Sequence, residues 1–260
     1  MSLLQIEKLV VSNPSNAHTA PLVDALNCDI DAGEILAIIG PNGAGKSTVL
    51  NAIAGDLNYH GKIQIQGISE LNQMRARQLA VLPQLSLLNF PYRVSEVVEL
   101  ARIPHQTGKV KDREIVEEAL ALMDISFLKD RLYPQLSGGE KQRVQLARVL
   151  AQIWNKDDAP NGTRLMLLDE PTAALDLGHQ QQLMQAIKDF AKSGVAIVIV
   201  LHDINLAAQT ANKLLALLCG EQIAFGTVET VVTRETIKRL FNIETTISAH
   251  PKYGTPVVIS

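Results

Sequence analysis

A glycine-rich run followed by a lysine and a hydroxyl could hold a chain of phosphates. Residues 40–47 read GPNGAGKS, which fits the spacing G-x-x-x-x-G-K-[ST]. In such a loop the glycines let backbone N–H groups curl around phosphates at the positive end of the following helix. Lys46 can then reach the β- and γ-phosphates, and Ser47 can offer a hydroxyl to Mg²⁺. The residues predicted to bind a nucleotide here are Gly40, Pro41, Asn42, Gly43, Ala44, Gly45, Lys46, Ser47 and Thr48.

Two carboxylates and a histidine follow apolar segments that are typical of buried strands. Asp169 and Glu170 come directly after residues 165–168, and His202 comes directly after residues 195–201. In open α/β sheets, ligands bind at the carboxyl ends of the strands. Asp169 suits the shell of a Mg²⁺ ion, and Glu170 could orient or deprotonate an attacking water. His202 could donate a hydrogen bond to a γ-phosphate, although an ordinary structural histidine fits its position equally well.

Residues 136–140 read LSGGE and indicate a second phosphate-binding surface. The paired glycines, Gly138 and Gly139, allow another group to approach the backbone closely, and a helical pattern follows them. The amides of that helix's first turn would face such a group. A plainer interpretation is a helix capping box, because Ser137 and Glu140 have its spacing. The local pattern alone favours the capping box, and the position between the two other motifs favours the phosphate surface.

These residues require a framework of alternating strands and helices. Residues 1 to about 83 look strand-rich, with alternating or apolar strands at 3–11, 34–39 and 63–66. A helix is predicted from residue 47 to residue 54, directly after the glycine-rich run.

The second half of the chain carries the same mixture. The pattern is helical from about residue 86 to residue 154, where Asp112 is expected to cap a helix with an apolar core-facing stripe. A polar loop at 155–162 precedes the strands at 165–168 and 195–201, with a helix between them at 178–192, so a parallel sheet is expected. The tail is predicted to hold one short helix, at 234–241, and two strands.

Composition narrows the class of protein. The chain has 260 residues, 47% of them hydrophobic and 20% charged, as in ordinary soluble globular proteins. Its formal net charge of −3 gives no general nucleic-acid footprint, and acidic residues interrupt the basic stretch at 109–113. The apolar runs are far shorter than a membrane span, and no signal-peptide pattern opens the chain. Cys28 and Cys219 are isolated and are expected to be small buried residues. A cytosolic protein is predicted, which would work at a membrane only through a partner.

Taken in order, the motifs resemble those of ATP-binding-cassette ATPases over nearly the whole chain. Residues 136–140 match the family's LSGGE signature letter for letter, and Gln84 falls at the family's Q-loop glutamine. Asp169 and Glu170 resemble the end of its Walker B strand, residues 174–176 resemble its D-loop, and His202 resembles its switch histidine.

The resemblance implies an α/β fold of a particular kind. It consists of a P-loop NTPase core with a mixed or parallel sheet, an antiparallel β subdomain and an inserted α-helical signature subdomain. Residues 1–260 would form one ATPase domain, with a nucleotide-binding core at 1–85 and 160–226, a helical subdomain at 86–159 and a C-terminal extension at 227–260.

The resemblance also implies a mechanism that uses ATP and Mg²⁺. Glu170, His202 and Gln84 would be the catalytic residues, and Ser47, Gln84 and Asp169 would hold the metal. Two copies would pair head to tail, so that the signature segment of one copy caps the γ-phosphate bound by the other. The capping residues would be Ser137, Gly138 and Gly139. ATP binding would close this dimer, and hydrolysis would reopen it.

One feature departs from the family. Its members usually stack an aromatic residue on adenine shortly before the phosphate loop, but residues 1–40 contain no Tyr, Phe or Trp. Apolar contact from Val11 would be a weaker substitute. Some loss of discrimination among nucleoside triphosphates would be consistent with this.

The single cassette resembles the ATPase subunits of bacterial importers. Residues 140–154, 175–180 and 250–256 look most like hemin importer ATPases, with ferric-siderophore and cobalamin importer ATPases as alternatives. The implied partners are a transmembrane permease dimer, a periplasmic substrate-binding protein acting indirectly and a second copy of this chain, but no nucleic acid. The implied location is peripheral, on the cytoplasmic face of the inner membrane.

The permease is expected to dock on the surface near residues 84–102. Phe90 and Tyr92 lie there, either as exposed contacts or as core residues. A cassette protein acting on ribosomes or DNA is the competing hypothesis. It is disfavoured because the stretch from Gln84 to Leu136 is short and the net charge is negative.

Overall fold

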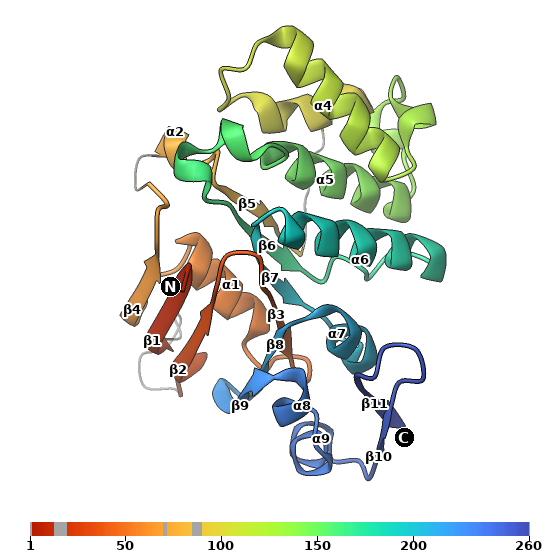
Figure 1. The fold of residues 1–260 in the computed structure, drawn as a ribbon. Helices are drawn as coiled ribbons and strands as arrows, with labels where there is room; N and C mark the ends of the chain where they lie inside the picture. Colours follow the sequence, from red (N-terminus) through yellow and green to blue (C-terminus); the bar gives the residue numbers. More distant parts are fainter. Residues whose placement is uncertain (1, 13–19, 70–71, 85–89, 260) are drawn as a thin grey trace. The chain divides into compact units, whose positions relative to one another are not determined.

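A computed structural model describes residues 2–12, 20–69, 72–84 and 90–259 of the chain (Figure 1). The chain forms two compact units. The first consists of Met1–Gln66 together with Ala196–Ser260, and the second consists of Gly67–Val195.

A mixed sheet runs through the first unit in the order β4-β1-β2-β9-β8-β3-β7. Strand β1 pairs antiparallel with both β2 and β4, whereas β3 is parallel to both β7 and β8. An antiparallel region and a parallel region therefore share this sheet, as expected for the fold class. Its strands are β1 (Leu4–Val11), β2 (Val23–Ile30), β3 (Ile35–Ile39), β4 (His60–Ile65), β7 (Ala196–Val200), β8 (Lys213–Leu218) and β9 (Glu221–Thr227).

The centre of this sheet is buried on both faces. All five residues of β3 and all five residues of β7 are buried and apolar, which is typical of parallel strands covered on two sides. Ile38 of β3 lies opposite Val200 of β7. Because the two strands are parallel and in this register, the residues that follow them emerge at the same edge of the sheet.

Helix α1 (Lys46–Ala54) starts where the glycine-rich run ends. It stops at Gly55, whose φ of 89° is left-handed, and the Gly55 N–H bonds the carbonyl of Ala52 at 3.1 Å. The prediction of a helix after the glycine-rich run is confirmed. The remaining helices of the unit are α7 (Ile204–Thr210), α8 (Val228–Val231) and α9 (Arg234–Phe241).

The C-terminal tail is tied to α7. Strands β10 (Thr246–Ala249) and β11 (Pro256–Ile259) form a separate antiparallel pair. The side chain of Asn205 in α7 accepts from the Val258 N–H at 2.8 Å and donates to the Val258 carbonyl at 3.1 Å. The short helix at 234–241 and both strands predicted in the tail are confirmed, and α8 is a further short helix that was not predicted.

The second unit combines a parallel strand pair with most of the helices. Leu82 of β5 pairs with Leu168 of β6, so the two strands also end at a common edge. The elements are β5 (Leu79–Leu82), β6 (Leu165–Asp169), α2 (Asn72–Arg75), α3 (Val94–Glu99), α4 (Lys109–Leu122), α5 (Gly138–Gln152) and α6 (Leu177–Lys192). Short 3₁₀ turns join them: η1 (Leu100–Arg102), η2 (Ser126–Leu128), η3 (Tyr133–Gln135), η4 (Lys156–Asp158) and η5 (Pro160–Gly162).

The start of α4 differs from the expectation. Gly108 is the N-cap residue, and Asp112 lies inside the first turn instead of capping the helix. The reason is a competing set of partners, because the Asp112 carboxylate accepts from Arg102 Nε at 2.9 Å and from the Thr107 hydroxyl at 2.6 Å. The expectation of a capping Asp112 was wrong.

The polar loop at 155–162 is more ordered than its composition indicates. Its two 3₁₀ turns place the Asp158 side chain, 4% exposed, within 2.8 Å of both Arg102 Nη2 and Lys111 Nζ. The loop thus packs a buried ion pair against α4 and η1.

One cysteine is also placed differently from the expectation. Cys28 is buried in β2, but Cys219 is exposed. Cys219 and Gly220 form the tight turn between β8 and β9, where both residues have positive φ, and a turn of this kind lies at the surface.

Among the residues that the structure describes, no helix combines the length and the apolar composition needed to cross a bilayer.

Candidate functional site

The phosphate-loop residues lie between β3 and α1, where close backbone packing requires glycine. A Cβ on Gly40 would lie 2.1 Å from the Leu217 carbonyl oxygen, and one on Gly45 would lie 2.7 Å from the Leu22 carbonyl oxygen. Asn42 and Gly43 are exposed at the tip of the loop. The loop therefore curls tightly at the N-terminus of α1, as the motif predicts.

Lys46 crosses the inside of this loop. Its side chain is buried, and its ammonium donates to the Gly40 carbonyl at 3.0 Å and to the Pro41 carbonyl at 2.9 Å. Ser47 and Thr48 follow it in the first turn of α1 and are half-buried. A positive charge and two hydroxyls are thus gathered at a helix N-terminus, which suits an anion.

His202 lies at the same edge of the first unit as the loop. The Leu201 N–H donates to the Ile38 carbonyl of β3 at 3.3 Å, and His202 follows as an exposed residue. Asp203 then caps α7, because its Oδ1 accepts from the N–H groups of Asn205 and Leu206 at 2.8 and 3.0 Å. The structure thus brings His202 and the phosphate loop to one sheet edge.

The second unit gathers the acidic pair and Gln84 at a sheet edge of its own. Asp169 is the last residue of β6 and is only 5% exposed, and Glu170 follows it half-buried. Gln84 follows β5 by two residues and is exposed. Since Leu82 and Leu168 are paired, these three side chains belong to neighbouring strand ends.

Glu170 has an unusual backbone. Its φ of 47° is left-handed, a conformation that costs a non-glycine residue on the order of 1–3 kcal/mol. The Ala173 N–H donates to the Glu170 carbonyl at 3.2 Å and closes a turn directly after the strand. Strain of this kind is concentrated at functional sites, where the surrounding structure maintains it.

The signature segment begins α5 and is a capping box. The Ser137 hydroxyl accepts from the Glu140 N–H at 3.3 Å, and the Ser137 N–H donates to Glu140 Oε2 at 2.7 Å. The backbone bond from Ser137, followed by its side-chain bond, lowers the pKa of the Glu140 carboxyl. The capping box is confirmed, and a phosphate role for Ser137, Gly138 and Gly139 stays a prediction.

The residues predicted to hold Mg²⁺ fit that ion by their chemistry. Ser47, Gln84 and Asp169 offer a hydroxyl, an amide carbonyl and a carboxylate, and Mg²⁺ prefers oxygen ligands of these kinds alongside phosphate oxygens. In the described parts of the chain there is no cluster of three or more His, Cys, Asp or Glu with metal-binding geometry.

A cavity in the first unit is lined by a tyrosine and a histidine that the sequence did not single out. It measures about 450 Å³ and is lined by Val11, Leu22, Tyr59 and His60, among others. Leu22 also supplies the carbonyl packed against Gly45, so the cavity adjoins the end of the phosphate loop. Val11 is almost fully buried in β1, which limits what it can offer a base.

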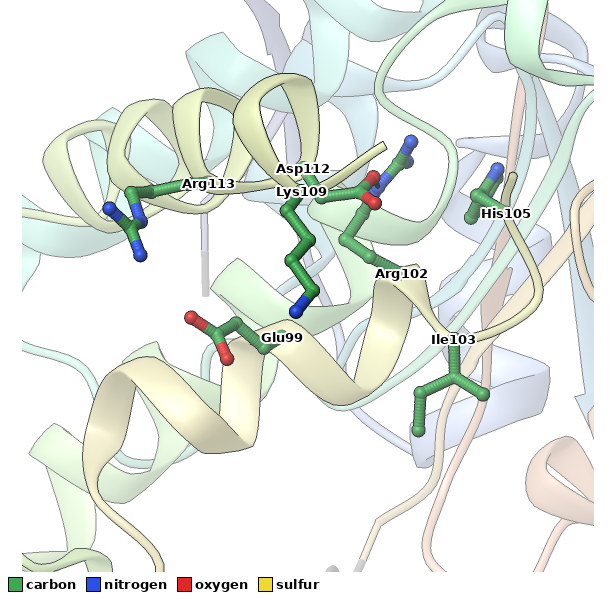
Figure 2. A pocket seen from close by; sticks show the side chains of 7 residues that line it. All are labelled: Glu99, Arg102, Ile103, His105, Lys109, Asp112 and Arg113. Atoms are coloured by element: carbon green, nitrogen blue, oxygen red, sulfur yellow. Dashed lines mark hydrogen bonds and ion pairs between the residues drawn. The ribbon is translucent and has the colours of Figure 1, made fainter. Parts of the chain in front are cut away.

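A second cavity, of about 560 Å³, lies in the second unit between η1 and α4 (Figure 2). Lys109 and Arg113 of α4 point toward the side where Glu99 lies, and Asp112 faces Arg102. The basic stretch at 109–113 is therefore balanced by acidic neighbours, as the sequence indicated. Ile103 at its rim is 73% exposed.

Sequence reasoning missed a contact between the signature helix and the D-loop. Arg143 Nη1 of α5 lies 2.9 Å from His179 Nε2, and His179 Nδ1 lies 2.8 Å from Asp176 Oδ2. In the sequence, His179 shows no metal-ligand spacing that would single it out. Its position three residues after a helix-capping aspartate could have indicated the contact with Asp176.

Comparisons with known proteins agree with this set of motifs. A family model described as ABC transporter matches residues 23–173. The hemin import ATP-binding protein HmuV of Gloeobacter violaceus is 47% identical over 244 residues, 92% of this chain and 88% of that protein. HmuV of Pseudomonas putida is 42% identical over 262 residues, 99% of this chain and 100% of that protein.

Solved structures share the fold. One of them is the inward-facing conformation of a protein described as a metal-chelate type ABC transporter. It has a TM-score of 0.79 to this chain at 28% identity. That match covers 100% of this chain and 98% of the other. The ATP-binding cassette MJ0796, as a dimer bound to ADP and Pi, has a TM-score of 0.76 at 26% identity, covering 86% of this chain and 98% of that chain.

Proposed function

Because this chain belongs to the ABC transporter family, we propose that it is the ATP-hydrolysing subunit of a bacterial hemin importer. The observation that carries the hemin assignment is the identity of 42–47% to hemin import ATP-binding proteins over nine-tenths or more of the chain. The phosphate loop, the acidic pair and the signature segment supply the residues that ATP hydrolysis needs.

The first unit binds the triphosphate of ATP. The backbone N–H groups of residues 42–48 surround the phosphates, and Lys46 exchanges its bonds to the Gly40 and Pro41 carbonyls for phosphate oxygens. His202 donates a hydrogen bond to the γ-phosphate, which its place beside the phosphate loop supports. These contacts stabilise the charge that develops during phosphoryl transfer.

The second unit supplies the catalytic carboxylate. Glu170 orients the attacking water and accepts its proton, and the turn it begins directs the chain away from the strand end. Ser47, Asp169 and Gln84 would hold Mg²⁺, whose charge would offset the negative charge of the phosphates. Gln84 is also the first residue of the segment 84–102, which is the proposed permease contact.

Two copies share each ATP. Ser137, Gly138 and Gly139 of one copy bind the γ-phosphate held by residues 40–48 of the other. The structurally similar cassette MJ0796 is a dimer bound to ADP and Pi, which supports the pairing of two copies. ATP binding then closes the dimer, and hydrolysis reopens it.

A permease dimer receives this motion. Phe90 is 64% exposed, Tyr92 40% and Ile103 73%, so the second unit presents large apolar side chains within and just beyond residues 84–102. Residues 85–89 of that surface lie outside the described residues. Exposed apolar groups of this size suit a protein partner. The complex works on the cytoplasmic face of the inner membrane and is supplied by a periplasmic substrate-binding protein.

We divide the chain by function into three parts. They are the core at 1–85 and 160–226, the helical subdomain at 86–159 and the extension at 227–260. The helical subdomain carries both the permease surface and the signature segment. The core carries the phosphate loop and the catalytic residues.

Transport in reconstituted vesicles tests the assignment. The chain is combined with its permease and binding protein, and ATP-dependent uptake of hemin is compared with uptake of a ferric siderophore and of cobalamin. We expect hemin uptake alone to depend on ATP. Uptake of the siderophore or cobalamin instead would replace the hemin assignment, and recovery of the chain with ribosomes and no permease would refute the importer.

A ferric-siderophore importer ATPase is the second candidate. The observation that favours it is the fold shared with a metal-chelate type transporter at a TM-score of 0.79. The same vesicles distinguish the two candidates.

A further inference from the structure

Three elements of the second unit meet around one arginine. Arg143 Nη1 donates to the Asp124 carbonyl at 3.0 Å, just beyond the end of α4, and lies 2.9 Å from His179 Nε2 in the first turn of α6. Figure 1 shows α4, α5 and α6 as neighbouring helices. The end of α4 is also joined to α6 directly, because Gln182 Nε2 donates to the Leu122 carbonyl at 2.7 Å.

One face of α5 contacts the segment that links Glu170 to Asp176. Gly139, Gln142 and Arg143 have the i, i+3, i+4 spacing of a single helix face. A Cβ on Gly139 would lie 2.8 Å from the Ala174 carbonyl oxygen, and Gln142 Nε2 donates to the Pro171 carbonyl at 3.3 Å. Arg143, through His179, reaches the end of the same segment.

The chemistry of the partners defines the tautomer of His179. A guanidinium group has only donors, so His179 Nε2 accepts the bond from Arg143. The ring proton then lies on Nδ1 and is donated to Asp176 Oδ2 at 2.8 Å. The His179 N–H also donates to Asp176 Oδ1 at 2.9 Å, so one residue holds both carboxylate oxygens.

We propose that His179 is a positioning residue. Through its bonds to Arg143 and Asp176 it holds the segment from Glu170 to Asp176 in a fixed position against the signature helix α5. The proposal rests on the proposed function, in which Glu170 and Ser137 both act on ATP. In this role His179 acts through its two neighbours, Arg143 and Asp176. A shift of α5 would thereby be transmitted to the segment that follows Glu170.

The charges around His179 come from each element packed on it. Arg143 comes from α5, Asp176 from the preceding loop, and Asp124 from the end of α4, with Oδ2 3.9 Å from Nε2. The two hydrogen bonds of His179 lower the pKa of the Asp176 carboxyl, the backbone bond first and the ring bond second. Asp176 therefore stays ionised and able to accept from Nδ1.

Two conservative variants separate the two bonds. An asparagine amide lies near the place of Nδ1, so His179→Asn can keep the bond to Asp176 and lose Arg143. A glutamine amide oxygen lies near the place of Nε2, so His179→Gln can keep Arg143 and lose Asp176. If the connection requires both bonds, each variant lowers kcat nearly as much as His179→Ala.

The experiment is a double-mutant cycle in kcat for ATP hydrolysis by the permease complex. We expect His179→Ala and Arg143→Ala each to lower kcat about tenfold and the double variant to lose no more than one single variant does, because the two residues act as a unit. The Kd of a nonhydrolysable ATP analogue for the single subunit should be unchanged. Gln185→Ala, which removes an exposed bond to Asp189 on the same helix, is the matched control.

Several results would overturn the proposal. The proposal is contradicted if the losses of kcat multiply in the double variant, or if the single variants leave kcat unchanged. It is also contradicted if His179→Asn or His179→Gln alone keeps the wild-type kcat, because one bond would then be enough. A lowered unfolding midpoint that accounts for the lost activity would indicate a merely structural contact. Absence of hydrolysis by the unaltered complex would instead refute the proposed function, which keeps the two failures distinguishable.

Discussion

At the scale of single residues, the proposed function depends on side chains placed just beyond strand ends. Glu170 combines a buried neighbour, Asp169, with a left-handed backbone that begins a turn. Such a residue gains nothing for stability from its conformation. The left-handed backbone therefore serves to position the Glu170 carboxylate. A substitution that removes the charge and keeps the shape of the side chain is the appropriate test.

Glu170→Gln is expected to leave ATP binding intact and to lower the turnover number by about 10²–10⁴-fold, the usual contribution of a general base. The closed dimer should accumulate with ATP, because the step that reopens it is lost. Single-turnover kinetics and size-exclusion chromatography with ATP measure the two effects. Hydrolysis near the wild-type rate would remove Glu170 from the mechanism.

His105 shows a different use of a histidine. Burial, and next the charge of Arg102, lower its pKa from 6.5 to about 4, and its Nε2 donates to the Gln152 carbonyl at 2.8 Å. Between these pKa values the unfolded chain binds a proton that the folded chain does not. Stability therefore rises with pH through this window, is complete above about pH 6.5 and falls as the pH drops toward about 4.

His105→Gln should accordingly flatten the dependence of the free energy of unfolding on pH between about pH 4.5 and about pH 7. Urea denaturation at a series of pH values gives the slope. If the free energy of unfolding has the same slope against pH in the wild type and in His105→Gln, the claim that His105 is held neutral by burial is wrong.

At the scale of elements, an ion cluster fastens the helical part of the second unit. Arg102, 3% exposed, bonds Asp112 of α4 and Asp158 of η4, and Lys111 approaches Asp158 from the solvent side. Burial alone would raise the pKa of the Asp158 carboxyl, but the hydrogen bonds from Lys111 and Arg102 outweigh it and lower that pKa. The cluster thus contributes stability above about pH 4, which is lost as the pH falls further.

Asp158→Asn is expected to lower the free energy of unfolding by about 3 kcal/mol at neutral pH, because it leaves a buried guanidinium short of a charge partner. Chemical denaturation measures the change. Asp157→Asn, on the same 3₁₀ turn but exposed, is the control and should cost under about 0.5 kcal/mol. An equal effect of the two substitutions would contradict a special role for the buried carboxylate.

Elements dominated by local pattern were predictable from the sequence, and elements dominated by distant partners were not. The apolar runs of β3, β6 and β7 and the glycine-to-helix junction at α1 lie within about one residue of their predicted bounds. Strands β2 and β9 were missed because they mix polar residues into a half-exposed pattern. Asp112 was misassigned because its partner Arg102 belongs to another element.

At the scale of the whole molecule, the order of motifs identified the family, whereas the connections among them needed the structure. The signature segment reads as a capping box and forms one, so its local geometry alone does not distinguish a structural helix start from half of an ATP site. The contacts through Arg143 and His179 join residues 36 apart in the chain, and no local pattern predicts that pairing. The proposed shared ATP site would need a second copy, so its test is an experiment on the dimer.

Mixing two inactive variants tests the shared site most directly. Lys46→Ala removes the phosphate-loop charge, and Ser137→Arg blocks the signature surface, so each homodimer should fail to hydrolyse ATP. In a mixed dimer both lesions fall in one site, and the other site is intact. We expect an equal mixture to recover about a quarter of the wild-type ATPase rate, because half of randomly paired dimers are mixed and each has one intact site. A mixture as inactive as its components would mean that each copy builds its own site, and would contradict the account.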